Sequence, residues 1–467
     1  MVATHEQSFQ APGVVPALAA VLPPAALVTD PDRLESFRYD RAQFCPAGVP
    51  GAVVLARETA HVSHALRVAS ELGVPVVPQG ARSGLSGAAN AVDGCIVIGL
   101  EKMNRVLEVD VPNRLVVTQP GVFNADLSRA VAEHGLFYPP DPSSWEFCSI
   151  GGNLSTNSGG LCCVKYGVTT DYVLGLEVVL ASGEVVRTGR RTVKGVAGYD
   201  LTRLFVGSEG TLGVITEATL SLRPASRAPE TMAALFGSTQ DAANAVAAVV
   251  AAGHVPSLLE IMDRTSLRAA NAYLRSDLPD DCAAMLMAQS DAGGDAGRAE
   301  VAAIAELATA AGATLVIEAD DPAEGEALLA ARRCVLLALE ALGTTMIDDV
   351  CVPRSRLADL MTGCEKIAAE HDLTIGVLGH AGDGNMHPTV VFDAADPDET
   401  RRAQISFEAI MALGLELGGT ITGEHGVGVL KREWLATEIG PVALDLHRKV
   451  KAALDPKGIL NPGKVFV

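Results

Sequence analysis

The stretch that decides the fold is PVVPQGARSGLSGA (residues 75–88), in which an apolar segment runs into a loop containing Gly80, Gly84 and Gly87. Glycine permits positive φ angles and a close approach of the backbone to a ligand, so successive N–H groups can point at an anion. We therefore expect a strand over 74–78 that leads into a phosphate-binding loop.

Further glycine-rich loops follow at 151–152, at 159–160 and at 207–213, each near the end of an expected strand. A single loop of this kind can be an ordinary tight turn. Four of them favour one extended, phosphate-bearing cofactor that lies across several loops. The first loop does not read GxGxxG, and no GxxxxGK[ST] occurs, so the two common nucleotide-binding motifs are excluded.

The hydrophobic pattern predicts mixed α and β structure in more than one domain. A chain of 467 residues is too long for one hydrophobic core. After Arg223-Pro224, alanine-rich helical periods alternate with strands, which marks a second α+β domain. The expected strands are 52–56, 74–78, 95–100, 106–110, 114–119, a hairpin over 176–189, 257–263 and 283–289, with helices at 58–72 and 241–253.

Charge and cysteine content exclude several classes of function. The 56 acidic and 36 basic residues give a net charge of −20, which disfavours binding to nucleic acid or to anionic lipid. The nine cysteines include no CxxC pair, so neither an iron–sulfur cluster nor a structural zinc site is expected. We expect these cysteines to be reduced thiols in the cytoplasm. The apolar stretch 13–28 holds three prolines and no lysine or arginine precedes Arg33, so neither a signal peptide nor a membrane span is expected.

Two histidine motifs lie in the C-terminal half. HAGDGNMHP (380–388) places His380 and His387 around a Gly-Asp-Gly turn, and a hairpin there brings both imidazoles to the same end of a sheet. GEHGVG (423–428) adds Glu424 and His425. Two imidazoles and a carboxylate form a ligand set for zinc, manganese or iron, although each histidine alone can be an ordinary hydrogen-bonded residue.

Together these motifs resemble a known family. PVVPQGARSGLSGA, PPDPSSWEFCSIGGNLSTNSGG (139–160) with VKYG, and GSEGTLGVIT (207–216) closely resemble the FAD-binding domain of the vanillyl-alcohol oxidase / p-cresol methylhydroxylase fold. HAGDGNMHP, GEHGVG and ILNPGK (459–464) resemble its glycolate oxidase D-subunit / D-lactate dehydrogenase branch. The resemblance spans 46–467 and implies an α+β protein with a two-part FAD-binding domain of the p-cresol methylhydroxylase type and an α+β cap domain.

The implied domains are a FAD-binding domain at 46–225, a substrate or cap domain with the metal site at 226–424, and a segment at 425–467 that returns to the FAD domain. Residues 1–45 are expected to pack on the FAD domain. The residues implied to contact FAD are Gly80, Ala81, Arg82, Ser83, Gly84, Pro142, Ser143, Ser149, Gly151, Gly152, Asn153, Thr156, Asn157, Gly159, Glu209, Ile215 and Asn461.

One departure from the family concerns the first loop. Relatives that bind FAD covalently often carry a histidine where this chain has Arg82, so we expect non-covalent FAD. His61 lies on an expected amphipathic helix and is interpreted as a surface residue, whereas Trp145 is interpreted as a core residue.

The resemblance also implies roles for the C-terminal residues. His380, His387 and Glu424 would bind a divalent metal, zinc or manganese, and His425 would be the catalytic base, with a role as a fourth ligand as the open alternative. Arg332 would bind the substrate carboxylate, with Thr389 as a further substrate-binding residue. The positions that hold a second carboxylate in relatives acting on 2-hydroxyglutarate are Leu336, Ile347 and Thr389, none of them cationic.

The sequence therefore predicts FAD-dependent oxidation of a small D-2-hydroxy acid, such as glycolate or D-lactate, in the cytoplasm or peripherally at the membrane. A separate acceptor, which can be a quinone, a cytochrome, an electron-transfer flavoprotein or oxygen, would reoxidise the flavin. A homodimer or an iron–sulfur partner subunit is an open possibility. The alternatives are a catalytic or electron-carrier subunit of a multi-subunit glycolate oxidase, a D-2-hydroxyglutarate dehydrogenase, a metal-free sugar or alcohol oxidase, an ether-lipid synthase and a metallohydrolase.

Overall fold

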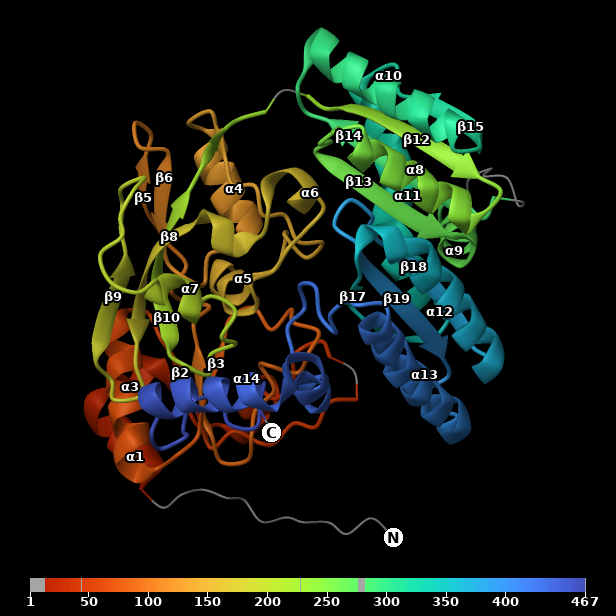
Figure 1. Ribbon diagram of the computed structural model, residues 1–467. Helices are drawn as coiled ribbons and strands as arrows, with labels where there is room; N and C mark the ends of the chain where they lie inside the picture. The colour runs from red at the N-terminus through yellow and green to blue at the C-terminus, as the bar shows by residue number, and fades with distance from the viewer. Residues whose placement is uncertain (1–12, 43, 227, 276–281, 467) are drawn as a thin grey trace. The chain divides into compact units, whose positions relative to one another are not determined.

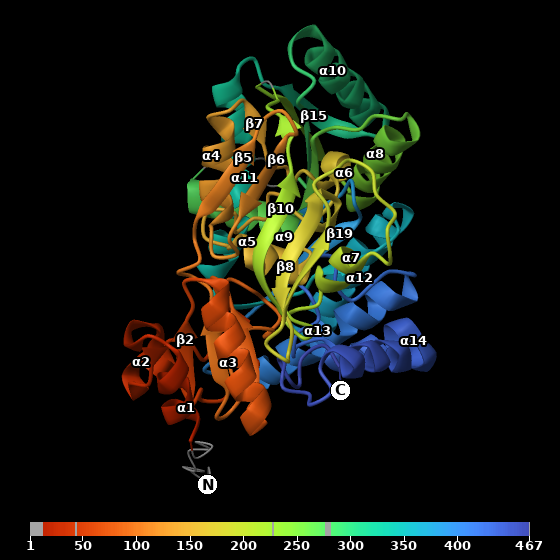
Figure 2. The same ribbon diagram turned by 90° about the vertical axis from the view of Figure 1, so that its left-hand side faces the viewer.

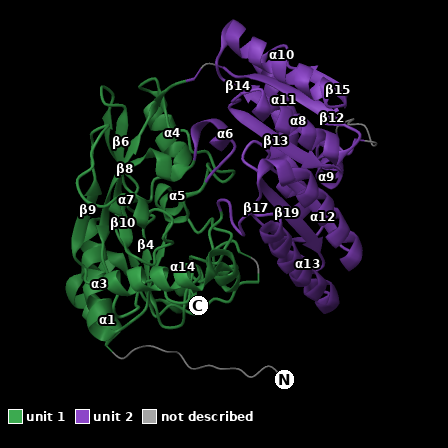
Figure 3. Cartoon of the chain, viewed as in Figure 1, with its two compact units in different colours: residues 1–158, 168–225, 425–467 green, residues 159–167, 226–424 purple. Residues whose placement is uncertain are grey.

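The structure is a computed structural model that describes residues 13–42, 44–226, 228–275 and 282–466 (Figure 1). The chain forms two compact units, coloured separately in Figure 3. The first unit comprises residues 1–158, 168–225 and 425–467, and the second comprises 159–167 and 226–424. The short segment 159–167 thus belongs to the second unit, although it lies within the predicted FAD-binding domain.

The first unit begins with a four-stranded sheet in the order β1-β2-β4-β3, in which β2, β4 and β3 are parallel. The helix that follows β2 leads into β3, and β4 inserts between these two strands, as expected for parallel strands joined by a crossover helix. Helix α1 packs against α3 beside this sheet (Figure 2). The elements are α1 (Val14–Val21), β1 (Leu27–Val28), α2 (Pro31–Glu35), β2 (Ala52–Leu55), α3 (Thr59–Leu72), β3 (Val76–Gln79) and β4 (Ile96–Gly99).

A five-stranded antiparallel sheet follows in the first unit, in the order β5-β6-β10-β8-β9, and β7 pairs with β11 in a small two-stranded sheet. The predicted hairpin at 176–189 is confirmed as β8–β9, and Gly183 has the positive φ of 81° that its tight turn requires. The remaining elements of this unit up to residue 225 are β5 (Val106–Asp110), β6 (Leu115–Thr118), α4 (Asn124–Ala132), β7 (Leu136–Phe137), α5 (Ile150–Thr156), β8 (Val173–Val179), β9 (Val185–Gly189), α7 (Leu201–Phe205), β10 (Val214–Ser221) and β11 (Arg223–Pro224).

The C-terminal segment returns to the first sheet. Helix α14 (Arg432–Leu454) is interrupted at Gly440 by a non-helical φ of 77°, next to Pro441. Beyond it, Val76 N–H donates to Ile459 O and Asn461 N–H donates to Val76 O, both at 2.7 Å. Leu460 therefore pairs in parallel with Val76 and covers the edge of β3.

The second unit is built on an eight-stranded sheet in the order β15-β12-β14-β13-β18-β19-β16, with β17 pairing to β19. Alternate residues of β12, β13 and β14 form one hydrophobic core with α9 and α11, and the residues between them face the opposite side. The elements are α6 (Cys163–Tyr166), β12 (Glu230–Phe236), α8 (Thr239–Ala251), β13 (Leu258–Asp263), α9 (Arg264–Leu274), β14 (Ala284–Ser290), α10 (Gly294–Ala310), β15 (Ala313–Glu318), α11 (Pro322–Glu340), β16 (Thr344–Ile347), β17 (Val350–Cys351), α12 (Leu357–His371), β18 (Thr374–His380), β19 (Asn385–Phe392) and α13 (Pro397–Glu416).

Two expectations about single residues are wrong. His61 is buried rather than on the surface, because its ring packs at the start of α3, where Nδ1 lies 3.4 Å from the N–H of Arg57. Trp145 is 41% exposed rather than part of the core, because it lies in a turn ahead of α5. Within the described ranges, no helix is both long and apolar enough to cross a membrane.

Candidate functional site

The glycine loop after β3 is joined to the start of α5 in the first unit. Ser149 caps α5, and its Oγ accepts hydrogen bonds of 3.3 Å from the N–H groups of Ala81 and Gly152. A Cβ at Gly80 would collide with Ser149 Oγ, so the close approach of the two segments requires glycine there.

The tip of this loop presents backbone donors. Arg82 has a left-handed φ of 56°, and the N–H groups of Arg82, Ser83 and Gly84 donate to no acceptor among the described residues. Successive unsatisfied N–H groups in a left-handed turn form an anion-binding concavity, which fits a pyrophosphate. The Arg82 guanidinium itself lies over the ring of Phe37, 4.7 Å from its centroid, and a guanidinium cannot replace the histidine of a covalent flavin link.

The glycine loop 207–213 is tied to the C-terminal segment through Glu209. Its carboxylate accepts hydrogen bonds of 2.8 Å from the N–H groups of Val427 and Gly428, and burial raises the pKa of Glu209 to about 7 in spite of these donors. Asn461 Nδ2 donates to the carbonyls of Glu209 (2.7 Å) and Ala88 (2.9 Å). Asn461 Oδ1 is buried and accepts no hydrogen bond from a described residue, so it fits a ligand with N–H or O–H donors, as FAD has.

Most of the other residues assigned to FAD lie near these loops, whereas Ser143 and Gly159 do not. The loop 207–213 is joined to α5, since Gly207 N–H donates to Leu154 O and Glu209 N–H donates to Ser155 O. Ser143 is exposed, and Gly159 belongs to the second unit, where its Cβ position would lie 2.8 Å from Glu424 Oε2. The remaining residues of the set fall on α5 or its end (Gly151, Gly152, Asn153, Thr156, Asn157), before it (Pro142) and on β10 (Ile215).

In the second unit, three adjacent strands bring the histidines together. Glu260 on β13 is directly opposite His380 on β18, and His387 on β19 lies opposite Leu378, two residues away. Paired residues of an antiparallel sheet point to the same face, and so do residues two apart, so these side chains share one face. The two imidazole centroids are 5.2 Å apart with the rings nearly perpendicular.

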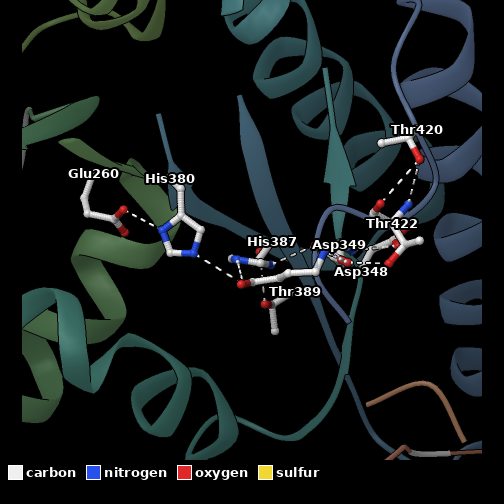
Figure 4. A network of polar contacts seen from close by, with 9 residues as sticks. Glu260, Asp348, Asp349, His380, His387, Thr389, Thr420 and Thr422 are labelled. Carbon is white, nitrogen blue, oxygen red and sulfur yellow. Dashed lines mark hydrogen bonds and ion pairs between the residues drawn. The ribbon is translucent and has the colours of Figure 1, made fainter. Parts of the chain in front are cut away.

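Glu424 lies close to both imidazoles, and Figure 4 shows His380 and His387 in the polar network that also holds Glu260. Its Oε1 lies 3.3 Å from His380 Nε2 and 3.2 Å from His387 Nε2. Burial alone would raise the pKa of Glu424, but the hydrogen bonds and positive charge of the two histidines lower it well below its ordinary value. Burial likewise lowers the pKa of His380, and the two flanking carboxylates Glu260 and Glu424 raise it well above the usual range.

These separations fit a bound divalent metal. Ligand bonds of about 2.0–2.2 Å at angles of about 90–110° place neighbouring ligand atoms about 2.8–3.6 Å apart. The two nitrogen–oxygen distances fall inside that interval, and the donor set of two buried imidazoles and one half-buried carboxylate suits zinc or manganese. His380, His387 and Glu424 are thus residues that could hold the ion.

Asp349 was missed by the sequence analysis. It lies between β16 and β17, is fully buried, and offers a ligand atom within 4.8 Å of those of His387 and Glu424. Its Oδ2 accepts hydrogen bonds from Thr422 Oγ1 (2.7 Å) and from the N–H of Glu424 (3.0 Å), so it fixes the segment that carries Glu424. His425 is the next residue of the chain, and a trans peptide places its Cα about 3.8 Å from that of Glu424.

Glu260 was also missed. Its Oε1 lies 2.6 Å from His380 Nδ1, and its Oε2 accepts a hydrogen bond of 2.6 Å from Arg332 Nε. Arg332 on α11 is buried, whereas its neighbour Arg333 is exposed and pairs with Glu326. The signal in the sequence was a carboxylate within the apolar strand SLLEIMD, since a buried charge requires a partner.

Thr389 lies beyond His387 on β19 and is buried, with its Oγ1 donating to His387 O at 3.3 Å. Ile347 is its cross-strand partner on β16. Neither of these two side chains carries a charge.

The turn between the histidines depends on Gly384, which has a φ of 80° and a Cβ position that would collide with the carbonyl oxygen of Val352. We expect Gly384→Ala to lower the free energy of unfolding by about 3 kcal/mol or more, combining left-handed strain with the clash. Gly418→Ala is the control, because Gly418 has nearly the same φ (79°) and open space around it, so about 1–2 kcal/mol is expected. Denaturant unfolding measures both, and equal losses would contradict the steric argument.

Comparison with known proteins finds a family match for each of two long stretches of the chain. Residues 50–189 match a family model described as "FAD binding domain", and residues 225–465 match one described as "FAD linked oxidases, C-terminal domain". The chain is 44% identical to the glycolate oxidase subunit GlcD of Bacillus subtilis, over 90% of this chain and 89% of that protein. It is 35% identical to a D-lactate dehydrogenase of Anaerostipes hadrus, over 97% of each chain.

A solved structure of p-cresol methylhydroxylase with bound substrate superposes with a TM-score of 0.81 at 18% identity, over 97% of this chain and 96% of that one. The fold predicted from the sequence is therefore confirmed. A family match over more than half of the residues, together with these relatives, settles the assignment: the chain belongs to the FAD-linked oxidases and is an FAD-dependent oxidoreductase.

Proposed function

We propose that this enzyme oxidises a small D-2-hydroxy acid, glycolate or D-lactate, to the 2-oxo acid. The observation that carries the proposal is the convergence of His380 and His387 on Glu424, one residue before His425. The relatives named glycolate oxidase subunit and D-lactate dehydrogenase support the same substrate class.

Each reacting group of a 2-hydroxy acid has a counterpart in the chain. Arg332 keeps its terminal N–H groups for a carboxylate while its Nε is held by Glu260, and a bidentate guanidinium–carboxylate pair would orient the substrate. FAD, when bound, accepts the hydride that leaves the carbon bearing the hydroxyl. The loop 80–84, with Ser149 and Asn461, would hold FAD without a covalent bond.

The hydroxyl proton must leave as the hydride does. An alcohol is too weakly acidic to ionise near neutral pH, and a divalent ion at His380, His387 and Glu424 would supply the Lewis acidity that lowers its pKa. His425 would then take the proton as general base. Asp349 would keep Glu424 in place through the N–H contact that it accepts.

A substrate with one carboxylate fits best. Leu336, Ile347 and Thr389 provide no cation for a second carboxylate, so 2-hydroxyglutarate is not favoured. A purely electron-carrying role is not favoured either, since it leaves the ligand set around Glu424 without a purpose.

We further propose that a separate acceptor reoxidises the flavin, and that this chain can work beside a partner subunit, since its relatives include a protein named as a subunit. None of the nine cysteines, all of which the structure describes, is in a disulfide, which suits a reducing compartment such as the cytoplasm.

The test is anaerobic bleaching of the bound flavin by glycolate, D-lactate, L-lactate and D-2-hydroxyglutarate, each with and without a chelator. Bleaching by glycolate or D-lactate that the chelator suppresses is the expected result. Bleaching by 2-hydroxyglutarate alone would overturn the monocarboxylate assignment. A flavin that no hydroxy acid reduces would overturn the proposed function as a whole.

A further inference from the structure

We propose that Glu260 is a positioning residue that couples the metal site to the substrate anchor, by holding His380 with one carboxylate oxygen and Arg332 with the other. This inference rests on the proposed function and deepens it, because it links two groups that act on different parts of the substrate. No part of the sequence motifs around His380 or Arg332 indicates such a link.

The geometry of the pair is set by the sheet. Glu260 and His380 are direct cross-strand partners on β13 and β18, so the carboxylate and the imidazole are side by side without any loop between them. Arg332 reaches the same carboxylate from α11, which covers this face of the sheet. All three residues are buried, with Glu260 only 1% exposed.

The first contact determines which imidazole nitrogen is available. Glu260 Oε1 lies 2.6 Å from His380 Nδ1, and Nε2 of the same ring faces Glu424. An ionised carboxylate can only accept a hydrogen bond, so Nδ1 carries a proton, and Nε2 is the nitrogen that would direct its lone pair to a bound metal. Rotation of the ring is prevented as well.

The second contact orients the guanidinium. Arg332 uses Nε to donate to Glu260 Oε2, at 2.6 Å. Because the guanidinium is planar and its N–H directions are fixed, binding through Nε determines the direction of the terminal nitrogens. Glu260 also balances the charge of Arg332, which otherwise would be buried with no carboxylate until a substrate arrives.

The chemistry of glutamine makes the proposal testable. Both neighbours of Glu260 present N–H donors, and a carboxylate accepts from both, whereas the amide of Glu260→Gln has one acceptor and one donor group. The amide N–H faces either Arg332 Nε, which only donates, or His380 Nδ1, which can accept only if the imidazole proton moves to Nε2. The substitution therefore breaks the contact to Arg332 or makes His380 Nε2 a poor ligand, while the volume of the side chain is nearly unchanged.

The experiment measures metal affinity and substrate affinity separately in the FAD-loaded full chain. Zn²⁺ affinity is measured by competition with a chromophoric chelator, and Mn²⁺ affinity by the spin-resonance signal of the free ion. We expect Glu260→Gln to raise the Kd for these ions about 10- to 100-fold, or to raise KM for the hydroxy acid by about 10-fold or more.

Asp263→Asn is the matched control. Asp263 is the last residue of the same strand, is equally buried, and caps α9 by accepting from Ser266 N–H, a role that asparagine can keep. Within the described part of the chain, Asp263 has no contact with His380 or Arg332. Asp263→Asn should therefore leave the metal affinity and the substrate affinity at the wild-type values. If Glu260→Gln does not fold, Glu260→Asp takes its place, since the shorter carboxylate keeps the charge and cannot span both contacts.

Unchanged Kd for both ions together with unchanged KM would overturn the inference and leave the proposed function intact. A wild-type protein that binds neither Zn²⁺ nor Mn²⁺ would overturn the inference together with the metal site. A lower metal affinity of Glu260→Gln in a protein that no hydroxy acid reduces would support the positioning role while contradicting the proposed function.

Discussion

Flavin reduction by the hydroxy acid is expected to slow about 10²- to 10⁴-fold when His425 is replaced by alanine, the range typical of a lost general base. The alanine variant should still bind FAD, because the FAD contacts argued above come from the loop 80–84, Ser149 and Asn461. It should also keep its metal, since His380, His387 and Glu424 are untouched. Rapid mixing of the oxidised enzyme with substrate under anaerobic conditions, followed at the flavin absorbance band, measures the rate.

The control for this prediction is His447→Ala. His447 is exposed on α14 and its Nδ1 is hydrogen-bonded to Ala443 O within the same helix, so its loss should leave the rate unchanged. Wild-type rates for His425→Ala would remove His425 from the role of base. A loss of bound metal in His425→Ala would instead identify it as a ligand.

Glu424→Gln is expected to reduce the bound metal to less than about one tenth of the wild-type amount and to slow flavin reduction about 10³-fold or more, because a metal supplies several kcal/mol of charge stabilisation. Glutamine keeps the size of Glu424 but offers a neutral amide to the two imidazoles, which lie 3.3 and 3.2 Å from Oε1. Elemental analysis of the purified protein gives the metal content, and the same rapid-mixing experiment gives the rate.

Glu416→Gln serves as the comparison, since Glu416 is an exposed residue at the end of α13 in the same unit. Added Zn²⁺ or Mn²⁺ should restore activity to chelator-treated wild-type protein and not to Glu424→Gln. A Glu424→Gln enzyme with full metal content and a normal rate would show that the three residues do not form the metal site.

Much of the fold and part of the candidate site could be predicted from local patterns in the sequence. The hairpin that holds His380 and His387 could be predicted because both strands and their turn lie within twenty residues, and the glycine loops could be placed at strand ends for the same reason. The bounds of the continuously apolar, buried strands β2 and β4 were predicted to within one residue. Those of β5, which is exposed or half-buried, were predicted without error.

The contacts that complete the site could not be predicted, because they depend on strand order. Glu260 is 120 residues from His380 and 72 from Arg332, and only the adjacency of β13 and β18 and the packing of α11 bring them together. Gly159 shows the converse, because residues that are neighbours in the sequence here belong to different units. It continues a motif assigned to FAD, yet the segment 159–167 packs with the second unit, next to Glu424.

The return of residues 459–461 to β3 has a consequence for the timing of biosynthesis. Until Leu460 is made, Val76 lies on an open strand edge with an unpaired donor and acceptor. At a translation rate of about 5–20 residues per second, ribosomes take about 20–80 seconds to reach it. Residues 226–424 emerge during this interval and hold nearly all of the second unit. A nascent chain arrested after residue 424 should therefore carry one nearly complete unit and one with an exposed strand edge, a state prone to aggregation and to capture by chaperones.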